Sequence, residues 1–387
     1  MQQTKWTPAL KRSQKHHDLA MKNADNYETW SEAAIEHDSH SGADEWKASD
    51  SSKNFDYQSV RRRLERFKAM REEGDDLGLI YAINEGIHGN MDGMGNSKLF
   101  DHAQFGTKQL IQDYVDVIVE TLRYLASPEV DVISEEKKVN LFRRARHCYG
   151  ASALLLSGSG AFMYFHVGVA KAFWEQGLLP RTMSGASGGA FVGSMMCTRT
   201  DDEIGEIFDP KWLHEKQIDK TKRERGSILS GNFASTKELY GHFSRFIPDL
   251  TFAEAYERSG RHLNISIAPS EQHQKSRLLN AIASPNVFIR EAVLASSALP
   301  GIFSPVGLMA KNHHGEKVPY LPNRRWVDGS MSNDIPAKRL ARLYGVNHHI
   351  VSQANPMVSG LAVDISRKDE PLQVVRDATV KSSITWM

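Results

Sequence analysis

The stretch Ser184-Gly185-Ala186-Ser187-Gly188-Gly189-Ala190 decides the fold, since it lies between a short apolar run and a run with helical character. Gly185, Ser187 and Gly189 form the pattern G-x-S-x-G, which is typical of a nucleophile elbow, where a serine occupies a sharp strand-to-helix turn. Such a turn is tight, so glycine on both sides of the serine fits sterically. Taken alone, the same residues also fit an ordinary turn of small residues.

The residues around the elbow repeat one pattern, in which a short apolar run is followed by a turn and a helix. The run Ala151–Leu156 ends in a glycine turn that opens a helix, and the elbow opens another helix that we expect to end at Cys197. This alternation is typical of a parallel α/β sheet. Further apolar runs at residues 263–268 and 349–352 suit strands of the same sheet. The sequence therefore predicts an α/β fold with a mainly parallel sheet.

A glycine turn upstream of the elbow could supply it with hydrogen-bond donors. Gly158, Ser159, Gly160 and Ala161 end an apolar run and open a helix, so their backbone N–H groups can point at one anion. Donors of this kind form the oxyanion hole of a serine hydrolase. The same turn could instead bind a phosphate or be purely structural. It is not a dinucleotide fingerprint, because Met163 stands where G-x-G-x-x-G has its last glycine.

A serine hydroxyl needs a base, and two kinds of residue could provide one. Asp328 follows an apolar pair and precedes a glycine, so it would end a strand at the edge where sites of such sheets gather. Its pKa would have to be raised by burial for it to act as a base. A plain Asp-Gly turn is the structural alternative. In a triad of serine, acid and histidine, His348 or His349 would take this role instead.

Composition excludes several classes of function. The 387 residues carry 48 Lys and Arg against 47 Asp and Glu, a net charge of +1, so we expect no nucleic-acid partner. Cys148 and Cys197 have no metal-ligand spacing, and we expect no metal or cofactor. The polar N-terminus does not resemble a signal peptide. We interpret the uncharged residues 147–170 as strand, turn and helix rather than as a membrane span. Two cysteines exclude a disulfide framework and fit a reduced compartment, so we expect an intracellular, cytoplasmic protein.

The first 150 residues lack a chemical motif and have helical periodicity. We expect one helix from His102 to Leu125 and another from Ser134 to His147, with Ser134 as its cap. The sequence thus predicts an N-terminal helical extension at residues 1–150 and a catalytic domain at residues 151–360. Residues 361–387 are expected to form a C-terminal linker and helix.

Four blocks of the sequence together resemble a known family. They are Ser157-Gly-Ser-Gly, Phe165-His-Val-Gly-Val, Gly185-Ala-Ser-Gly-Gly and Asp328-Gly-Ser with Asp334-Ile-Pro, and their order and spacing are similar to those of the patatin-like phospholipase domain. The resemblance covers about residues 150–360 and implies a three-layer α/β/α sandwich with a Ser–Asp dyad. The preceding region resembles the helical extension of fungal and plant triacylglycerol lipases.

The resemblance implies that Ser187 is the nucleophile, Asp328 the proton acceptor, and the turn at Gly158 the oxyanion loop. That loop departs from the family pattern Gly-Gly-Gly-x-Arg/Lys-Gly at Ser159, Phe162 and Met163. A member of this family would be a serine acyl-ester hydrolase that releases fatty acids from triacylglycerol or glycerophospholipid through an acyl-enzyme.

Such a hydrolase would meet its substrate at a membrane or lipid-droplet surface, so we expect peripheral association with one. A non-hydrolytic lipid-binding or scaffold protein and a lipid transacylase are the alternatives on the same fold. His166 is expected to be a packed helix residue rather than a catalyst.

Overall fold

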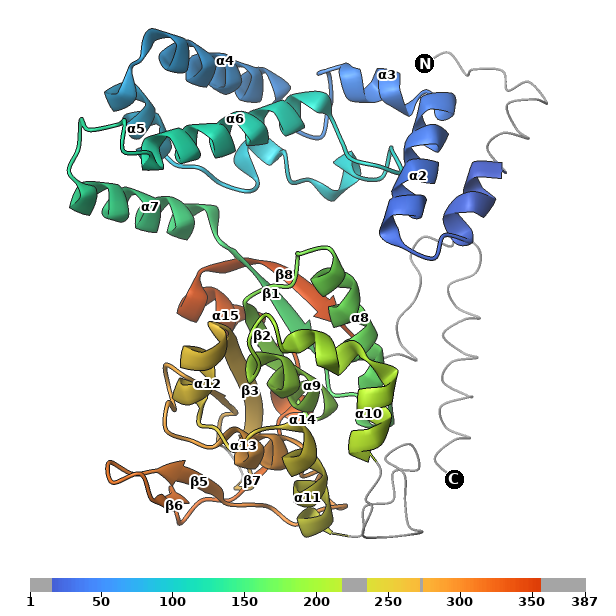
Figure 1. Cartoon of the computed structure of the whole chain (residues 1–387), viewed down its shortest axis with the longest axis vertical. Coiled ribbons are helices and arrows are strands. Elements are labelled where there is room, and N and C mark those ends of the chain that lie inside the picture. Colours follow the sequence, from blue (N-terminus) through green and yellow to red (C-terminus); the bar gives the residue numbers. More distant parts are fainter. Residues whose placement is uncertain (1–15, 218–234, 272–273, 356–387) are drawn as a thin grey trace. The chain divides into compact units, whose positions relative to one another are not determined.

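The computed structural model describes residues 16–217, 235–271 and 274–355 (Figure 1). The chain divides into two compact units, Met1–Gly150 and Ala151–Met387, which are described separately. The C-terminal linker and helix expected at residues 361–387 lie outside the described residues.

The first unit is built from helices around its own hydrophobic core. Apolar residues of α4 and α6 pack together in that core, among them Leu64, Phe67 and Leu110. Ser134 caps α7 as expected, by accepting a hydrogen bond from the Lys137 amide. The main helices are α2 (Tyr27–Ser41), α3 (Ala43–Ala48), α4 (Tyr57–Glu73), α5 (Asp76–Asn84), α6 (Gln109–Ala126) and α7 (Glu135–Tyr149).

Helix α6 begins at Gln109, seven residues later than the predicted start at His102. The preceding segment is held by Asp38, whose carboxylate accepts hydrogen bonds at 2.9 Å from the backbone N–H groups of Gln104 and Phe105. Gly106 has a φ of +72°, which a helix cannot contain. The predicted start was therefore wrong, because a long-range contact competes with helical hydrogen bonding.

The second unit contains a mixed sheet of six strands in the order β4-β3-β2-β1-β8, with β7 also paired to β3 (Figure 1). The pairs β1–β2, β1–β8 and β2–β3 are parallel, and β4 and β7 run antiparallel to β3. The strands are β1 (Ala151–Leu156), β2 (Thr182–Gly185), β3 (His262–Pro269), β4 (Arg277–Asn280), β7 (Trp326–Asp328) and β8 (Val346–Ser352). A separate hairpin joins β5 (Leu308–Lys311) to β6 (Lys317–Tyr320).

Helices cover both faces of this sheet. Successive residues of a strand point to opposite faces, and both faces carry apolar side chains that must be covered. Leu154 and Leu156 of β1 belong to a large core with α8, α9 and α13, whereas Ala153 and Leu155 face a smaller core with Leu340 of α15. The predicted α/β sandwich with a mainly parallel sheet is confirmed. Its helices are α8 (Met163–Glu175), α9 (Gly188–Cys197), α10 (Pro210–Gln217), α11 (Thr236–Phe246), α12 (Phe252–Ser259), α13 (Ile289–Ser296), α14 (Ser330–Asn333) and α15 (Ala337–Tyr344).

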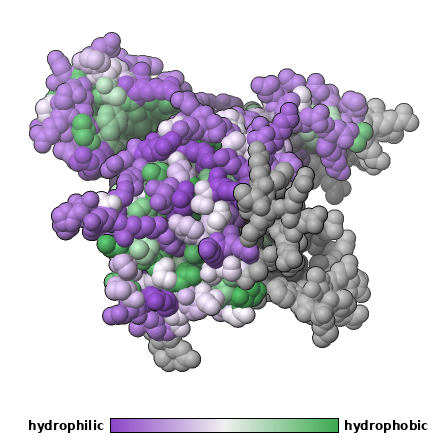
Figure 2. All heavy atoms as spheres, turned by 60° about the horizontal axis from the view of Figure 1, so that its bottom comes forward, coloured by the Kyte–Doolittle hydropathy of each residue, from purple (hydrophilic) through white to green (hydrophobic). Residues whose placement is uncertain are grey.

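Hydrophilic residues dominate the visible surface of the described residues, and apolar side chains appear on it in separate patches (Figure 2). Exposed apolar side chains are normal when they are scattered, and a function is suggested only where they gather near a site. No described helix combines the length and the apolarity needed to span a membrane.

Candidate active site

Ser187 lies on a strained turn between β2 and α9. Its φ of 50° and ψ of −120° are unusual for a residue other than glycine and mark local strain. The two flanking glycines are needed for close packing. A Cβ on Gly185 would come within 2.4 Å of the Gly189 backbone, and a Cβ on Gly189 within 2.3 Å of the Leu156 carbonyl oxygen. The local geometry is therefore that of a nucleophile elbow.

A buried serine on the neighbouring helix holds the elbow in place. The Ser187 backbone N–H donates to Ser296 Oγ at 2.9 Å, and Ser296 Oγ–H donates to the Ser266 carbonyl oxygen at 2.7 Å. This pair of hydrogen bonds ties the strained turn to β3. Sequence reasoning missed Ser296, since nothing in its local spacing marks it as part of the site.

Strand β7 places Asp328 beside the elbow. Ile267 of β3 pairs with Asp328 on one side and with Arg277 of β4 on the other. Since β4 and β2 flank opposite sides of β3, strand β7 lies on the same side as β2. Strand β2 pairs with β3 only as far as Ile265, so β7 continues beyond the end of β2, where the chain turns into Ser187.

Asp328 is almost completely buried, with 1% of its surface exposed. Burial raises the pKa of its carboxyl group, an effect that hydrogen bonding from Ser330 and the nearby Ser187 hydroxyl partly opposes. Oδ1 accepts the Ser330 backbone N–H at 2.8 Å, while Oδ2 is buried without a hydrogen bond of regular geometry among the described residues. Ser187 and Asp328 are thus close neighbours, and the carboxylate keeps one oxygen available for a proton.

The glycine turn differs from the expectation at its first residue. The Gly158 N–H donates to Asp334 Oδ1 at 2.7 Å, so this amide is already engaged and is not available to an oxyanion. Asp334 Oδ2 accepts from the side-chain amide of Asn355 at 3.4 Å. Burial raises the pKa of Asp334, and the Gly158 N–H partly lowers it. The sequence contained Asp334 in the Asp-Ile-Pro block but gave no sign of this contact.

The other residues of the turn retain open donors. The backbone N–H groups of Ser159, Gly160 and Ala161 have no protein acceptor within the described part of the chain. The same holds for the N–H of Gly188, directly after Ser187 at the start of α9. Free N–H groups at helix N-termini favour negative charge. The turn and the elbow therefore both present N–H groups without an acceptor among the described residues.

The histidines considered as alternative bases lie away from this edge of the sheet. Strand β8 is parallel to β1 and ends with Ser352 paired to Leu156. His349 precedes that end by three residues, which corresponds to about 10 Å along the strand. His348 is exposed, and its Nδ1 is hydrogen-bonded to Ser152 Oγ at 2.9 Å. Neither histidine is placed to take a proton from the elbow serine.

His166 is a packed residue, as expected. It is completely buried, and burial lowers the pKa of its imidazole. Nε2 lies 3.0 Å from the Ser157 carbonyl oxygen and must donate to it, so Nδ1 accepts from Ser352 Oγ at 2.7 Å. The neutral ring thereby links β8 to the residue that begins the glycine turn.

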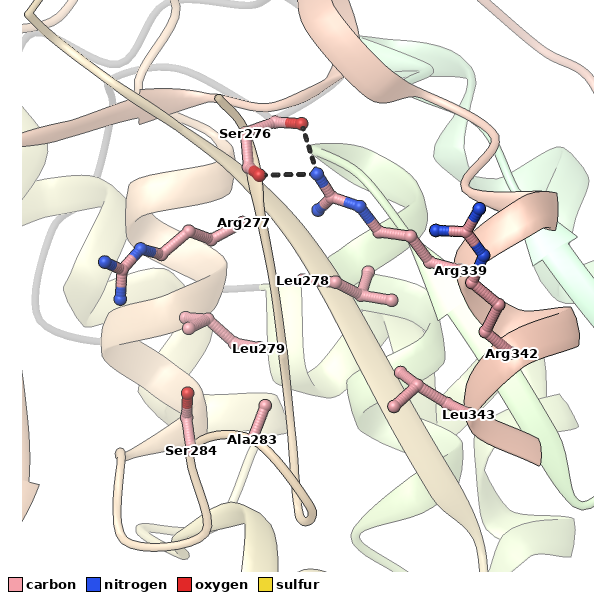
Figure 3. Close-up of a pocket in the computed structure, with 9 residues that line it drawn as sticks. All are labelled: Ser276, Arg277, Leu278, Leu279, Ala283, Ser284, Arg339, Arg342 and Leu343. Carbon is pink, nitrogen blue, oxygen red and sulfur yellow. Dashed lines mark hydrogen bonds between the residues drawn. The ribbon is translucent and has the colours of Figure 1, made fainter. Parts of the chain in front are cut away.

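A cavity of about 400 Å³ lies elsewhere in the second unit, between β4 and α15 (Figure 3). Arg339 crosses it and donates to the Ser276 carbonyl oxygen at 2.7 Å and to Ser276 Oγ at 3.3 Å (Figure 3). None of the predicted site residues lines this cavity, so it is not the candidate active site. Across residues 16–217, 235–271 and 274–355, no three His, Cys, Asp or Glu side chains are grouped to hold a metal ion.

Comparison with known families divides the chain as the two units do. Residues 5–147 match a domain of unknown function (DUF3336). Residues 154–341 match the patatin-like phospholipase family, and this range includes the elbow, the glycine turn and Asp328.

Similar full-length proteins come from fungi. A patatin-like phospholipase domain-containing protein of Meyerozyma guilliermondii is 36% identical over 86% of this chain and 47% of its own length. A protein of Cryptococcus neoformans described in the same words is 36% identical over 87% of this chain and 39% of its own length. The chain thus spans less than half the length of these relatives.

Among solved structures, VipD from Legionella pneumophila shares 14% identity and a TM-score of 0.32, over 53% of this chain and 50% of that chain. A likeness this low supports no argument about the site.

Proposed function

Because residues 154–341 place the chain in the patatin-like phospholipase family, we propose that it is a serine acyl-ester hydrolase that releases fatty acids from lipids. Triacylglycerol and glycerophospholipid are the proposed substrates, with Ser187 as nucleophile and Asp328 as proton acceptor.

The observation that carries the proposal is the pairing of a strained serine with a buried carboxylate. An ionised carboxylate is costly to bury unless it is paired or serves the chemistry. Perturbed carboxyl groups of this kind cluster at functional sites. The raised pKa of Asp328 brings it closer to the range in which a carboxylate is an effective base.

In the proposed acylation step, each of these groups has one role. Ser187 Oγ attacks the ester carbonyl carbon while Asp328 Oδ2 accepts the hydroxyl proton. The carbonyl oxygen becomes an oxyanion, which the N–H groups of Ser159, Gly160 and Gly188 stabilise. When the tetrahedral intermediate collapses, the alcohol leaves with the proton from Asp328, and the fatty acyl group remains on Ser187 as an ester.

Deacylation uses the same groups in the reverse order. Asp328 takes a proton from a water molecule as that water attacks the acyl carbon, and the proton returns to Ser187 Oγ when the ester bond breaks. The fatty acid leaves, and both residues regain their starting states. Transfer of the acyl group to an alcohol instead of water would make the protein a transacylase.

Exposed apolar residues beside the turn suit contact with a lipid surface. Phe162 and Phe165 are 62% and 58% exposed and flank the start of α8. Met331, which is 66% exposed, follows Ser330, whose side chain lies against Gly158. Residues 147–170 carry no charged Asp, Glu, Lys or Arg. We therefore propose that this rim docks on a neutral or zwitterionic lipid surface.

Release of fatty acid from triolein and phosphatidylcholine micelles tests the proposed function. The wild-type chain should release fatty acid and react with a fluorophosphonate probe at Ser187. The variants Ser187→Ala and Asp328→Asn should lose at least about 10³-fold in rate, the scale on which removal of such groups acts. His349→Ala is the matched control and should retain activity.

Each failure has a distinct meaning. An inactive wild-type chain that the probe does not label would favour the non-hydrolytic lipid-binding alternative. Full activity of Asp328→Asn would exclude the dyad. Formation of a new acyl ester in the presence of glycerol, without free fatty acid, would identify a transacylase.

A further inference from the structure

Ser159 carries a buried hydroxyl group without a hydrogen-bond partner. Only 2% of its surface is exposed, and within the described part of the chain no donor or acceptor pairs with its Oγ. Buried hydroxyl groups nearly always have a partner, and leaving one unpaired costs free energy. An unpaired hydroxyl at this position of the fold therefore requires an explanation.

This hydroxyl faces the nucleophile elbow. Ser159 Oγ lies 2.4 Å from the position that a Cβ of Gly188 would occupy, so it is packed directly against the residue that follows Ser187. Its own backbone N–H and that of Gly160 are also open. A hydroxyl donor and several amide donors are thus gathered between the turn and the elbow.

We propose that the Ser159 hydroxyl donates a hydrogen bond to the carbonyl oxygen of the acyl substrate as that oxygen becomes an oxyanion. This inference rests on the proposed hydrolase function and adds a side-chain donor to the amides of the turn. Among the described residues the hydroxyl has no competing acceptor, and its hydrogen bond to the substrate strengthens as the carbonyl oxygen gains negative charge. An interaction gained mainly in the transition state raises kcat rather than affinity.

The position of Ser159 within the turn makes a purely structural role a poor explanation. Ser184 also has a buried hydroxyl without a partner among the described residues, but it lies within β2, three positions before Ser187. Ser159 instead belongs to the segment whose amides remain open. A side-chain donor also suits this turn because its first amide, that of Gly158, is occupied by Asp334.

The test is steady-state hydrolysis of a soluble p-nitrophenyl ester by the full chain, because a soluble substrate separates chemistry from binding to a lipid surface. Ser159→Ala and Ser159→Gly should each lower kcat by about 10- to 100-fold, somewhat less than the loss seen for a stronger amide donor of an oxyanion hole. KM should change less than about twofold, since this hydrogen bond is weak to the neutral ester and strong to the oxyanion. Ser184→Ala is the matched control and should retain kcat.

The rate of labelling of Ser187 by a fluorophosphonate provides a second measurement, since that reaction also develops charge on an oxygen near the donors. It should fall in both Ser159 variants, while the melting temperature of Ser159→Ala stays at or above the wild-type value. Unchanged or increased kcat in both variants would overturn the inference, and an increase would indicate that the hydroxyl blocks the site. If the wild-type chain hydrolyses esters through Ser187 but the Ser159 variants do so equally well, only the inference about Ser159 fails. If the wild-type chain is inactive, the proposed function itself fails.

Discussion

Asp328 is a carboxylic acid that the fold buries almost completely, and burial raises its pKa above the usual value of 3.8. A raised pKa means that the folded state disfavours the ionised form. The contribution of Asp328 to the free energy of unfolding is therefore complete below pH 3.8 and is lost as the pH rises through the higher folded-state pKa. At neutral pH the ionised carboxylate of Asp328 therefore lowers the free energy of unfolding.

The variant Asp328→Asn should consequently be more stable than the wild type at neutral pH, because asparagine has the same shape and no charge. The difference in melting temperature should shrink toward zero as the pH falls to about 4, near the unperturbed pKa of aspartate. Thermal unfolding followed by circular dichroism between pH 4 and pH 8 measures this difference. A difference that does not depend on pH would mean that Asp328 is not the titrating group.

Ser296 holds the proposed nucleophile Ser187 through the backbone, by accepting from the Ser187 N–H and donating to the Ser266 carbonyl oxygen. Ser296→Ala leaves both buried groups unpaired, so the free energy of unfolding should fall by about 1–3 kcal/mol. Loss of these two hydrogen bonds should also slow fluorophosphonate labelling of Ser187. Urea denaturation and labelling kinetics measure the two effects, and the less buried neighbour Ser297→Ala serves as control. Equal stabilities and equal labelling rates in the two variants would show that Ser296 does not support the elbow.

At the scale of elements, the elbow depends on the close approach of α9 to β1. A Cβ on Gly189 would lie 2.3 Å from the Leu156 carbonyl oxygen and 2.5 Å from that of Ser157. Both atoms belong to the backbone, so neither can move without disturbing the strand end and the glycine turn that follows it.

A Gly→Ala change that the backbone tolerates stabilises a protein by up to about 1 kcal/mol, and one that it does not tolerate destabilises it by more than that. We therefore expect Gly189→Ala to lower the free energy of unfolding by more than about 1 kcal/mol. Gly241→Ala is the matched control, because Gly241 lies in α11 with no atom within 4 Å of its Cβ position. That variant should gain about 0.5–1 kcal/mol from the better helix propensity of alanine. Chemical denaturation measures the stability of both variants. Equal stabilities would contradict the close approach of Gly189 to the backbone of Leu156 and Ser157.

The elements differ in how well their sequences predicted them. The elbow helix α9 and the capped helix α7 match the expected positions to within two residues, because caps and periodicity are local properties. The start of α6 was misplaced, since Asp38, 66 residues before Gln104, holds the preceding segment. The Gly158 donor was misplaced for the same kind of reason, with Asp334 176 residues away.

At the scale of the whole molecule, each unit has its own hydrophobic core, and the predicted site residues all belong to the second unit. The proposed reaction requires this unit to meet a lipid phase, and the proposed docking rim lies where the glycine turn passes into α8. Insertion of such residues into a lipid surface is favoured by the hydrophobic effect.

The double variant Phe162→Ser/Phe165→Ser should bind neutral vesicles at least about tenfold more weakly, since two aromatic side chains each contribute 1.5–3 kcal/mol when fully buried. Its kcat on a soluble ester should stay within about twofold of the wild type, because both side chains are largely exposed and neither has a role in the proposed chemistry. Vesicle flotation and a soluble-ester assay measure the two quantities. Leu178→Ser is the control, since Leu178 is 66% exposed but precedes the opposite end of β2. Equal loss in both variants would show that general hydrophobicity, not this rim, governs binding.

The sequence by itself determined the α/β alternation, the elbow at Ser187 and the candidate set of turn, nucleophile and acid, because these follow from periodicity and from the small volume of glycine. Only the tertiary structure decided which groups meet. Asp328 is 141 residues from Ser187, and it reaches the elbow because β7 pairs with β3 beyond the end of β2. The choice of strand partners depends on long-range hydrogen bonds and packing, which no local spacing encodes. The pairing of β8 with β1 likewise leaves His348 and His349 away from Ser187, and this arrangement favours Asp328 over the histidines as the proposed base.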